Sequence, residues 1–331
     1  MKADIFIPTS NRIESLRLCL DSLNNQTTKD FTVILVGLCR DDKVKKLLGK
    51  YQKLKIKYLI QKRKGLIGAA NEALKIARNG VFVRIDDDVI LTRHWYKHLI
   101  ETYQMDDGIG GVTGPTIMSQ IGLKSRDLTA FIETFKVSNN PILRLLFYIY
   151  NNIIYENKML AVSQFLESGV FTLGSNYPQC LALSGSQTVN NLEACNWSSR
   201  TVLLRKIGGF DTIYLKGLGD YHEADAALKI KKLGYKLIFN PKVALKHNVE
   251  IGTVAKARPA PFYRIQNFLI FYFRFFKITR INQLLRFMLN LLMQNLYYLF
   301  RFLSTGKFNQ LGAVPGTFVG LIRVITGYKV K

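Results

Sequence analysis

Acidic residues are missing from the last part of this 331-residue chain, although basic residues are frequent there. Residues 251–331 contain twelve Lys and Arg and no Asp or Glu, so they carry half of the formal net charge of +24. The four cysteines show no CxxC spacing. This excludes a small disulfide scaffold, and we expect reduced thiols in a cytosolic setting.

Long apolar runs and the common phosphate-binding motifs are missing as well. No window of about 18 residues is free of charge and polarity, so no helix is expected to cross a membrane. A signal peptide is not expected, because "MKADIFIPTSNR" runs straight into a strand. "GLIGAAN" has the wrong spacing for a GxGxxG fingerprint and lacks the Lys of a P-loop. An aspartyl-phosphate phosphatase would carry its nucleophilic Asp in the N-terminal strand, where Pro8 and Thr9 stand.

What the chain does have is an alternation of apolar strands and helical segments. Strands are expected in "ADIFIPTS", "FTVILVGL", "KIKYLIQ" and "VFVRIDDD", with a helical pattern between each pair. Residues 116–190 are less regular, and order returns with "CNWSSRTVLLRKIGGFD", "HEADAALKIKKLG", "KLIFNP" and "VALKH". The alternation predicts an α/β fold with a mostly parallel, Rossmann-like sheet, in which ligands bind beyond the carboxyl ends of the strands.

Three consecutive carboxylates follow the fourth strand. Asp86, Asp87 and Asp88 lie within the otherwise apolar run "VRIDDDVI". Like charges at the end of a buried strand repel one another unless a cation balances them. A D-x-D spacing lets two carboxylates reach one hard divalent ion and leaves its other positions for a diphosphate. A solvated acidic turn is the alternative, and the apolar flanks weigh against it.

These segments resemble, in the same order, those of the family-2 glycosyltransferases, inverting enzymes of the GT-A fold that use nucleotide-sugar donors. The resemblance rests on "IPTSNR" with "SLNNQT", "KGLIGAANEALKIARNGVFVRIDDDV", "CNWSSRTVLLRKIGGFD" and "HEADAALKIKKLGYKLIFNPKVALKH", and covers about residues 3–250. It implies a nucleotide-sugar-binding half over residues 1–115 and an acceptor-binding half of the same GT-A domain over residues 116–250, with hexosyltransferase activity.

The resemblance also implies roles for individual residues. Asp86 and Asp88 would hold a Mg²⁺ or Mn²⁺ on the donor diphosphate together with His247, for which a surface histidine at a strand end is the alternative. Asn196 and Trp197 fall in the sugar and acceptor pocket, although most tryptophans fill cores. Contacts with the nucleotide donor are implied for Pro8, Thr9, Arg12, Asp42, Gly65, Asn71, Asp86 and Asp87.

Two departures from the family pattern concern the base and the nucleotide. The acceptor helix usually opens with Glu-Asp, and those positions are His222 and Glu223 here, so Glu223 takes the place of the catalytic base. Asp225 and Asp220 compete for that role, and a helix N-terminus also favours acids through its dipole. The second strand usually ends in Asp-Asp-Gly-Ser, whose acid contacts the nucleobase. Here it ends "VGLCRDD", so either Asp41 or Asp42 substitutes, or Thr9 and Arg12 carry more of the nucleotide.

The basic tail, residues 251–331, is rich in aromatic and aliphatic residues. If residues 281–301 are helical, their polar side chains share one narrow stripe: Gln283, Arg286, Asn290, Gln294 and Arg301. Packing against the catalytic domain would explain part of this pattern. Nucleic-acid binding is not expected, because the apolar content is too high. An amphipathic helix at an anionic membrane surface fits the apolar bulk, the arginines and the lack of acids.

We therefore expect a metal-dependent inverting glycosyltransferase of the bacterial or archaeal surface-glycan type, peripheral on the cytoplasmic face of the cell membrane. Its donor would be a nucleotide-diphosphate sugar, and its acceptor a lipid-linked or growing glycan. Transfer to a polyprenyl phosphate, which needs no acceptor base, is an alternative. A catalytically inactive, membrane-docked binding module is another, favoured by the missing Asp-Asp-Gly-Ser and opposed by the intact Asp86–Asp88 pair.

Overall fold

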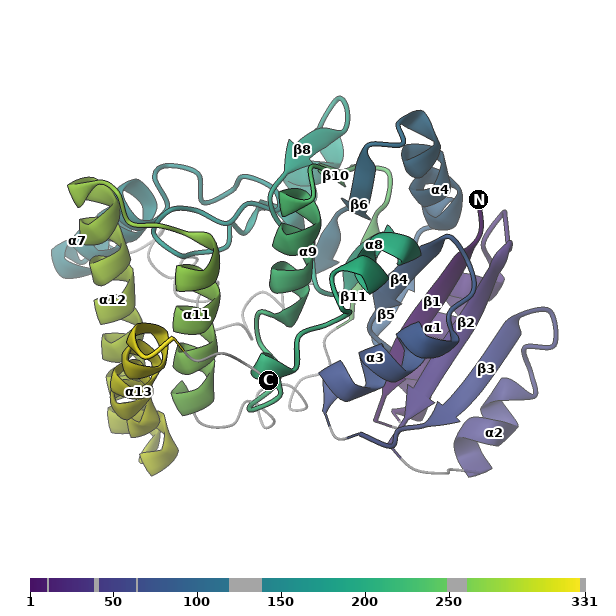
Figure 1. The fold of residues 1–331 in the computed structure, drawn as a ribbon, viewed down its shortest axis with the longest axis horizontal. Helices are drawn as coiled ribbons and strands as arrows, with labels where there is room; N and C mark the ends of the chain where they lie inside the picture. Colours follow the sequence, from purple (N-terminus) through teal and green to yellow (C-terminus); the bar gives the residue numbers. More distant parts are fainter. Residues whose placement is uncertain (11, 39–41, 64, 119–138, 249–260, 328–331) are drawn as a thin grey trace.

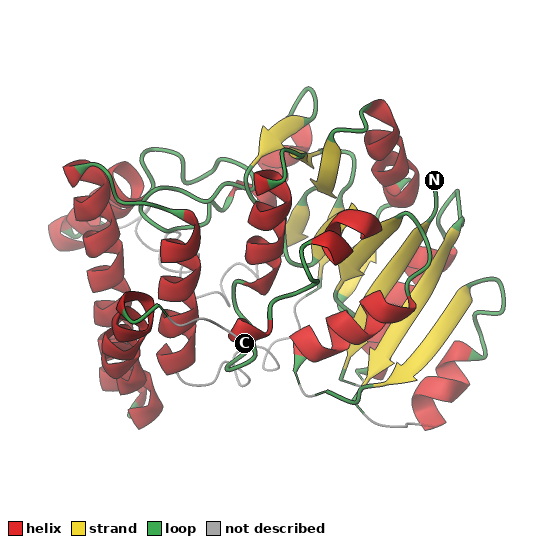
Figure 2. Cartoon of the chain, in the orientation of Figure 1, coloured by secondary structure: helices red, strands yellow, loops and turns green. Residues whose placement is uncertain are grey.

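The computed structural model describes the chain except for residues 11, 39–41, 64, 119–138, 249–260 and 328–331. A sheet with its covering helices forms one end, and a group of helices forms the other (Figures 1 and 2). The elements of the first third are β1 (Ala3–Thr9), α1 (Ile13–Asn24), β2 (Phe31–Gly37), α2 (Asp42–Leu48), β3 (Lys55–Ile60), α3 (Leu66–Ile76), β4 (Val81–Ile85), β5 (Val89–Leu91), α4 (Trp95–Met105), β6 (Ile109–Thr113) and β7 (Thr116–Met118).

The middle of the chain is less regular. Its elements are α7 (Pro141–Tyr148), the π-helix η1 (Ile149–Ile154), the 3₁₀ turns η2 (Gly174–Asn176), η3 (Pro178–Ala182) and η4 (Thr212–Tyr214), β8 (Gln187–Val189), β9 (Asn196–Arg200), α8 (Thr201–Lys206), α9 (His222–Lys232), β10 (Lys236–Phe239) and β11 (Leu245–His247). The C-terminal elements are α11 (Pro261–Phe275), α12 (Ile281–Thr305), the 3₁₀ turn η5 (Phe308–Gly312) and α13 (Ala313–Ile325).

The described strands form a large mixed sheet and a small one. The large sheet has the order β3-β2-β1-β4-β9-β6-β10-β8, and the small one has the order β5-β11-β7. Strands β3, β2, β1 and β4 are parallel, whereas β9 runs antiparallel to β4 and β6. The small sheet brings β11 beside β5, which follows directly after the aspartates. The small sheet therefore brings together segments that are far apart in sequence, β5 and β11.

Alternating side chains of the strands build two hydrophobic cores, one on each face of the large sheet. Ile5 and Ile7 of β1 pack with Leu16 and Leu20 of α1, whereas Phe6 belongs to the opposite core. All five side chains are fully buried. Burial of apolar surface on both faces is the main stabilising contribution in such a layered fold. The Phe6 side also receives α3, α8, α9 and α11.

Helix α11 is part of this second core. Its residues Ile265, Phe268, Leu269 and Phe271 are fully buried or nearly so. Phe271 stacks on Tyr221, which directly precedes α9, with ring centroids 5.3 Å apart. Packing against the α/β part thus accounts for α11, as one of the interpretations of the sequence expects. Helices α12 and α13 lie farther out, at the helical end of the molecule (Figure 1).

The α/β class, the mostly parallel sheet and the helical C-terminal region are confirmed. The segment left unassigned from the sequence contains short helices and turns, and its residues 119–138 lie outside the described part. The division into residues 1–115, 116–250 and 251–331 stays a prediction, since both of the first two segments supply strands to the large sheet. The boundary at residue 250 also lies outside the described residues.

Candidate active site

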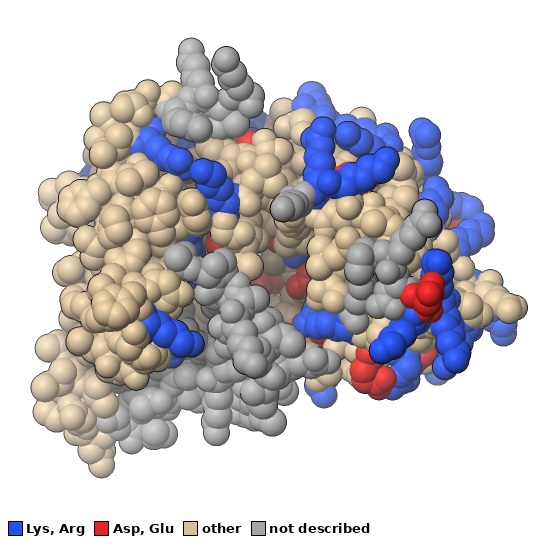
Figure 3. Space-filling model, turned by 90° about the horizontal axis from the view of Figure 1, so that it is seen from below, with Lys and Arg blue, Asp and Glu red and all other residues tan. Residues whose placement is uncertain are grey.

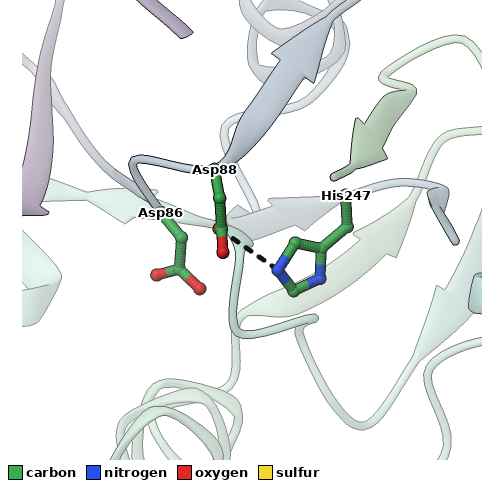
Figure 4. A group of neighbouring side chains, drawn as sticks. All are labelled: Asp86, Asp88 and His247. Carbon is green, nitrogen blue, oxygen red and sulfur yellow. Dashed lines mark ion pairs between the residues drawn. The ribbon is translucent and has the colours of Figure 1, made fainter. Parts of the chain in front are cut away.

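The ends of two strands bring Asp86, Asp88 and His247 together. Strand β4 ends at Ile85, so Asp86 and Asp88 follow it at the carboxyl edge of the sheet, and His247 is the last residue of β11. Each offers one ligand atom within 4.8 Å of the others. Figure 4 shows the three side chains pointing into the same space. This is the group that the D-x-D spacing and the terminal histidine predict.

The charges around Asp88 favour a cation at this place. Arg12 Nη1 lies 2.9 Å from Asp88 Oδ2, and His247 Nε2 lies 3.2 Å from Asp88 Oδ1. Burial disfavours the carboxylate, but His247 and Arg12 outweigh it and lower the pKa of Asp88. Burial also opposes the charged form of His247, whereas its contacts with Cys195 and Asp88 raise its pKa to about 10. A proton on His247 therefore balances the carboxylate, and a metal ion would have to displace it.

The donor set fits a hard divalent cation. Two carboxylates and one imidazole are ligands that Mg²⁺ and Mn²⁺ accept. Asp88 Oδ1 is buried, and His247 Nε2 lies 3.2 Å from it, so a protonated His247 already faces this oxygen. A metal ion bound in place of that proton would satisfy the same oxygen. Asp86 is partly exposed and keeps the site open on one side.

Asp87 is held by two side chains near the end of β1, and its implied contact with the donor stays a prediction. Its carboxylate is buried, accepts a hydrogen bond from Thr9 Oγ1 at 2.7 Å and pairs with Arg12. Asp87 thus orients Thr9 and Arg12, two residues for which donor contacts are implied. Asp87 and Asp88 lie in the turn after β4, and the same guanidinium of Arg12 pairs with both carboxylates.

A buried arginine connects the metal-site carboxylates to the expected base. Arg84 of β4 has its Nη2 3.0 Å from Asp86 Oδ1, and its Nη1 donates to Glu223 Oε1 and, at 2.5 Å, to the carbonyl oxygen of Ala194. His222 Nδ1 lies 2.8 Å from the other oxygen of Glu223. Burial would raise the pKa of Glu223, but His222 and Arg84 lower it to about 2. Glu223 is therefore ionised at neutral pH.

Asp225 requires a correction, because it lies in a structural ion-pair network. It is fully buried, and its oxygens lie 2.6 Å from Lys229 Nζ and 2.6 Å from Arg274 Nη1. Arg274 belongs to α11, so Asp225 fastens α9 to the C-terminal helices. A fully buried carboxylate between two cations is not available to an acceptor hydroxyl. Asp220, the other competitor, lies 4.0 Å from Arg264.

The expected acceptor residues Asn196 and Trp197 are core residues. Trp197 is fully buried, packs on Phe210 with ring centroids 5.2 Å apart and donates from Nε1 to the carbonyl oxygen of Glu223 at 3.2 Å. Asn196 is buried and bonds Trp95 and the carbonyl oxygen of Val243. Both side chains are buried in this structure and present no face to a sugar, so the acceptor assignment stays a prediction without structural support. The alternative that tryptophans fill cores holds here.

The remaining donor-side residues lie near the end of β1, at the start of α2, and in α3 or directly before it. Gly65 precedes α3 with φ of 85°, which a residue with a Cβ rarely adopts. Asn71 exchanges hydrogen bonds with the backbone of Phe210 at 2.8 and 2.9 Å. Both line a cavity of about 590 Å³, which none of the three metal-site residues lines. Asp42 is exposed at the start of α2, Pro8 is half-buried in β1, and Asp41 lies outside the described residues.

Residues 4–162 match the family model described as glycosyl transferase family 2. The matched segment contains the D-x-D pair and ends before α9. This chain carries a family 2 glycosyltransferase domain. A comparison with curated proteins found no match.

The fold of this glycosyltransferase also resembles solved structures. Mannosyltransferase PcManGT from Pyrobaculum calidifontis, solved with GDP-Man and Mn²⁺, has a TM-score of 0.53 at 16% identity and covers 99% of this chain and 88% of its own. TarS 1–349 from S. aureus has a TM-score of 0.58 at 13% identity, over 98% of this chain and 81% of its own. GalNAc-T7, with UDP, GalNAc and Mn²⁺, has a TM-score of 0.54 at 15% identity over 76% and 44%.

One residue of the glycosyltransferase site, Arg84, and one residue beside the end of β2, Tyr58, were not predicted from the sequence. Arg84 could have been found, because a single arginine inside the apolar strand "VFVRI" must have an anionic partner to be buried. Tyr58 of β3 had no such signal. A Cβ added at Gly37 would lie 2.8 Å from the Tyr58 hydroxyl, so the ring takes the space beside the end of β2. Gly37 thus stands where the family pattern has an acidic residue, and the Tyr58 ring lies next to it.

Proposed function

We propose that this glycosyltransferase moves a sugar from a nucleotide-diphosphate donor to a lipid-linked or growing glycan, with inversion at the anomeric carbon and with Mg²⁺ or Mn²⁺ as cofactor. The observation that carries this proposal is the convergence of Asp86, Asp88 and His247 within 4.8 Å at the carboxyl edge of the sheet. In α/β sheets this edge is where ligands bind.

The solved structures support a nucleotide-sugar donor. PcManGT was solved with GDP-Man, and TarS with UDP and with UDP-GlcNAc. Their nucleotides and sugars differ from one another, so they support the donor class and not its identity. PcManGT and GalNAc-T7 were both solved with Mn²⁺, an ion that two carboxylates and one imidazole can bind.

Each residue of this site has a role in the proposed reaction. Asp86, Asp88 and His247 would hold the metal ion, which when bound neutralises negative charge on a diphosphate leaving group. Arg12, fixed by Asp87 and Asp88, adds positive charge beside the same place. Glu223 accepts the proton of the acceptor hydroxyl, and it is ionised at neutral pH as a base must be. Arg84 pairs with both Glu223 and Asp86 and so fixes the position of one carboxylate relative to the other.

One observation favours a second acceptor chemistry. A base works best when its pKa lies near the operating pH, and the pKa of Glu223 is about 2 while it pairs with Arg84 and His222. Transfer to a polyprenyl phosphate needs no base, because the acceptor oxygen is already anionic. The two acceptors are distinguished by whether removal of the Glu223 charge lowers turnover.

The experiment that tests the proposal is a thermal-unfolding screen of nucleotide-diphosphate sugars with and without Mn²⁺. A ligand that binds only the folded protein raises the unfolding midpoint, and we expect the increase to require both the nucleotide and the metal ion. Product analysis by NMR with the nucleotide sugar so identified then gives the anomeric configuration. Stabilisation that is equal with Mn²⁺ and with a chelator would contradict the metal role, and a product that retains the donor configuration would contradict inversion.

A further inference from the structure

Helix α12 exposes an apolar face, whereas a surface helix of a water-soluble protein usually exposes its polar face. One stripe along it consists of aliphatic residues, all of them exposed: Leu285, Met288, Leu292, Leu296, Leu299 and Leu303. Their exposed fractions run from 44% to 73%. Spacings of three and four residues place them on a single face. Seen in isolation, this face has the composition of a buried core.

The opposite face of α12 lies against the protein and carries polar residues beside the buried Phe287 and Met293. Gln283 and Asn290 are buried, and Asn290 Nδ2 donates to the carbonyl oxygen of Ser168 at 2.9 Å. Gln283 Oε1 accepts from the backbone N–H of Thr279 at 3.1 Å. Arg286 reaches Glu156 at 3.1 Å. The polar stripe that the sequence shows therefore does not face water, as an ordinary surface helix would require.

Two neighbouring helices continue the apolar surface at the same end of the molecule (Figure 1). Helix α13 exposes Val314, Phe318 and Ile322 at spacings of four, and α7 exposes Ile142 and Leu145. Asn295 of α12 donates to Thr317 Oγ1 of α13 at 3.1 Å, which holds the two helices side by side. Contrary to the sequence expectation, Phe308–Ile325 is long and apolar enough to cross a membrane by length and composition alone, and only 17% of it is buried.

Basic groups outnumber acidic ones at this end of the molecule. In Figure 3 most of the visible surface of the helical end carries no charged groups, with a few basic groups on it and acidic groups only toward the centre of the view. Residues 251–331 carry twelve basic and no acidic residues. Part of that charge is compensated internally, because Arg274, Arg280 and Arg286 pair with acids of the catalytic part. The basic residues of this segment that remain unpaired with these acids leave a positive net charge at this end.

We propose that the outward faces of α7, α12 and α13 form a surface that docks on a lipid bilayer with anionic headgroups. An apolar face bordered by basic groups, without acids, matches the boundary between acyl chains and anionic headgroups. The helices lie in the plane of the interface, because the other faces of α12 and α13 are packed on the protein. The docking surface would hold the active site at the membrane, where a lipid-linked acceptor is found.

A second copy of the chain fits this surface less well. A monomeric water-soluble protein rarely leaves so continuous an apolar face uncovered, so some occupant is expected. Self-association would bring two positively charged tails together, and like charges across an interface oppose binding. An anionic bilayer complements the same charge. Because three of the arginines are paired internally, the apolar contribution should dominate over the salt-sensitive one.

The test is co-sedimentation of the full chain with vesicles of phosphatidylcholine, alone or mixed in equal parts with phosphatidylglycerol. We expect the wild type to sediment with both, more strongly with the anionic vesicles. The triple variant L285Q/L292Q/L299Q, altered only at exposed positions, should bind at least about tenfold more weakly, since three leucines no longer enter the acyl region. The matched control is M105Q/V202Q/L233Q, whose residues are exposed on the catalytic part and should leave vesicle binding unchanged.

Three outcomes would overturn the proposal. These are no sedimentation of the wild type with either vesicle, equal loss of binding in both triple variants, and a wild-type dimer that becomes monomeric in L285Q/L292Q/L299Q while its vesicle binding stays unchanged. Stabilisation by a nucleotide sugar with Mn²⁺ should be the same in the wild type and in both variants. Failure of that stabilisation in all three proteins would count against the proposed function and leave the vesicle result intact.

Discussion

Arg84 Nη2 lies 3.0 Å from Asp86 Oδ1, inside a strand that is otherwise apolar. The same guanidinium also pairs with Glu223, so one buried cation connects a metal-site carboxylate to the expected base. A buried arginine is tolerated only when its charge is compensated, and here two carboxylates share it. Arg84 therefore fixes the distance between the two halves of the site, which come from β4 and α9.

The first prediction concerns the metal site. Asp88→Asn removes one ligand charge and little volume, so we expect it to abolish stabilisation by a nucleotide sugar with Mn²⁺ and to lower turnover by about 10³-fold, since a metal ion contributes several kcal/mol to the transition state. Asp30→Asn is the control, because Asp30 is an exposed acid that pairs with Lys2 at 3.1 Å. Equal Mn²⁺-dependent stabilisation in D88N and wild type would show that Asp88 does not bind the metal ion.

The second prediction concerns the base. Glu223→Gln should leave donor binding nearly unchanged and lower turnover by about 10² to 10⁴-fold, the usual contribution of a positioned general base. Steady-state kinetics with separate donor titration measures both effects. Turnover near that of the wild type would favour transfer to an acceptor that is already anionic, such as a polyprenyl phosphate.

The third prediction separates Asp225 from catalysis. Because Asp225 is buried between Lys229 and Arg274, Asp225→Asn should lower the free energy of unfolding by about 3 kcal/mol, as expected when one partner of a buried ion pair is removed. Urea unfolding measures this change. At a temperature where the variant is folded, its turnover should stay within a few-fold of the wild type, so a stable but inactive D225N would return the base role to Asp225.

The strands and the metal site could be predicted because local patterns determine them. Alternation of apolar residues selects strands, and a D-x-D at a strand end lies at the ligand-binding edge whatever the rest of the chain does. Trp197 and Asn196 could not be assigned this way. Whether a strand residue faces the core or a ligand depends on which elements cover that face, and the covering residues Phe210 and Trp95 are distant in sequence.

Sequence periodicity also leaves open which face of helix α12 lies against the protein. The stripe containing Gln283 and Asn290 was found from spacing, but a periodic pattern shows only that a helix has two unlike faces. Which face lies on the protein depends on what surrounds the helix. Ser168 and Glu156 supply polar partners on the protein side, so here the polar face is turned inward.

The fourth prediction concerns pH. The pKa of Glu223 in the folded chain is about 2, below its ordinary value of 4.5, so its ionised form stabilises the folded state. That contribution is fully present above about pH 4.5 and is lost as the pH falls toward 2. The difference in unfolding free energy between wild type and E223Q should therefore be constant near neutrality and shrink in acid. Urea unfolding at a series of pH values measures it, and a difference that stays constant in acid would mean that Arg84 and His222 do not lower this pKa.

The last prediction tests how α13 is held. Gly312, Gly316 and Gly320 recur every four residues, a spacing that lets two helices approach closely. A Cβ at Gly316 would lie 2.6 Å from the carbonyl oxygen of Phe262 in α11, which is backbone and cannot turn aside. Alanine is favoured over glycine in a helix by about 1 kcal/mol, yet we expect Gly316→Ala to lower the unfolding free energy by about 1–3 kcal/mol because of this overlap.

Gly185→Ala is the control for Gly316→Ala, since nothing lies within 4 Å of a Cβ at Gly185. It should leave the urea midpoint unchanged or raise it slightly. If α13 moves away from α11 in G316A, the exposed residues Phe318 and Ile322 lose their fixed position, and vesicle binding should weaken together with stability. A G316A variant as stable as the wild type would mean that the glycine face of α13 does not pack on α11, because a Cβ cannot be accommodated 2.6 Å from a backbone oxygen.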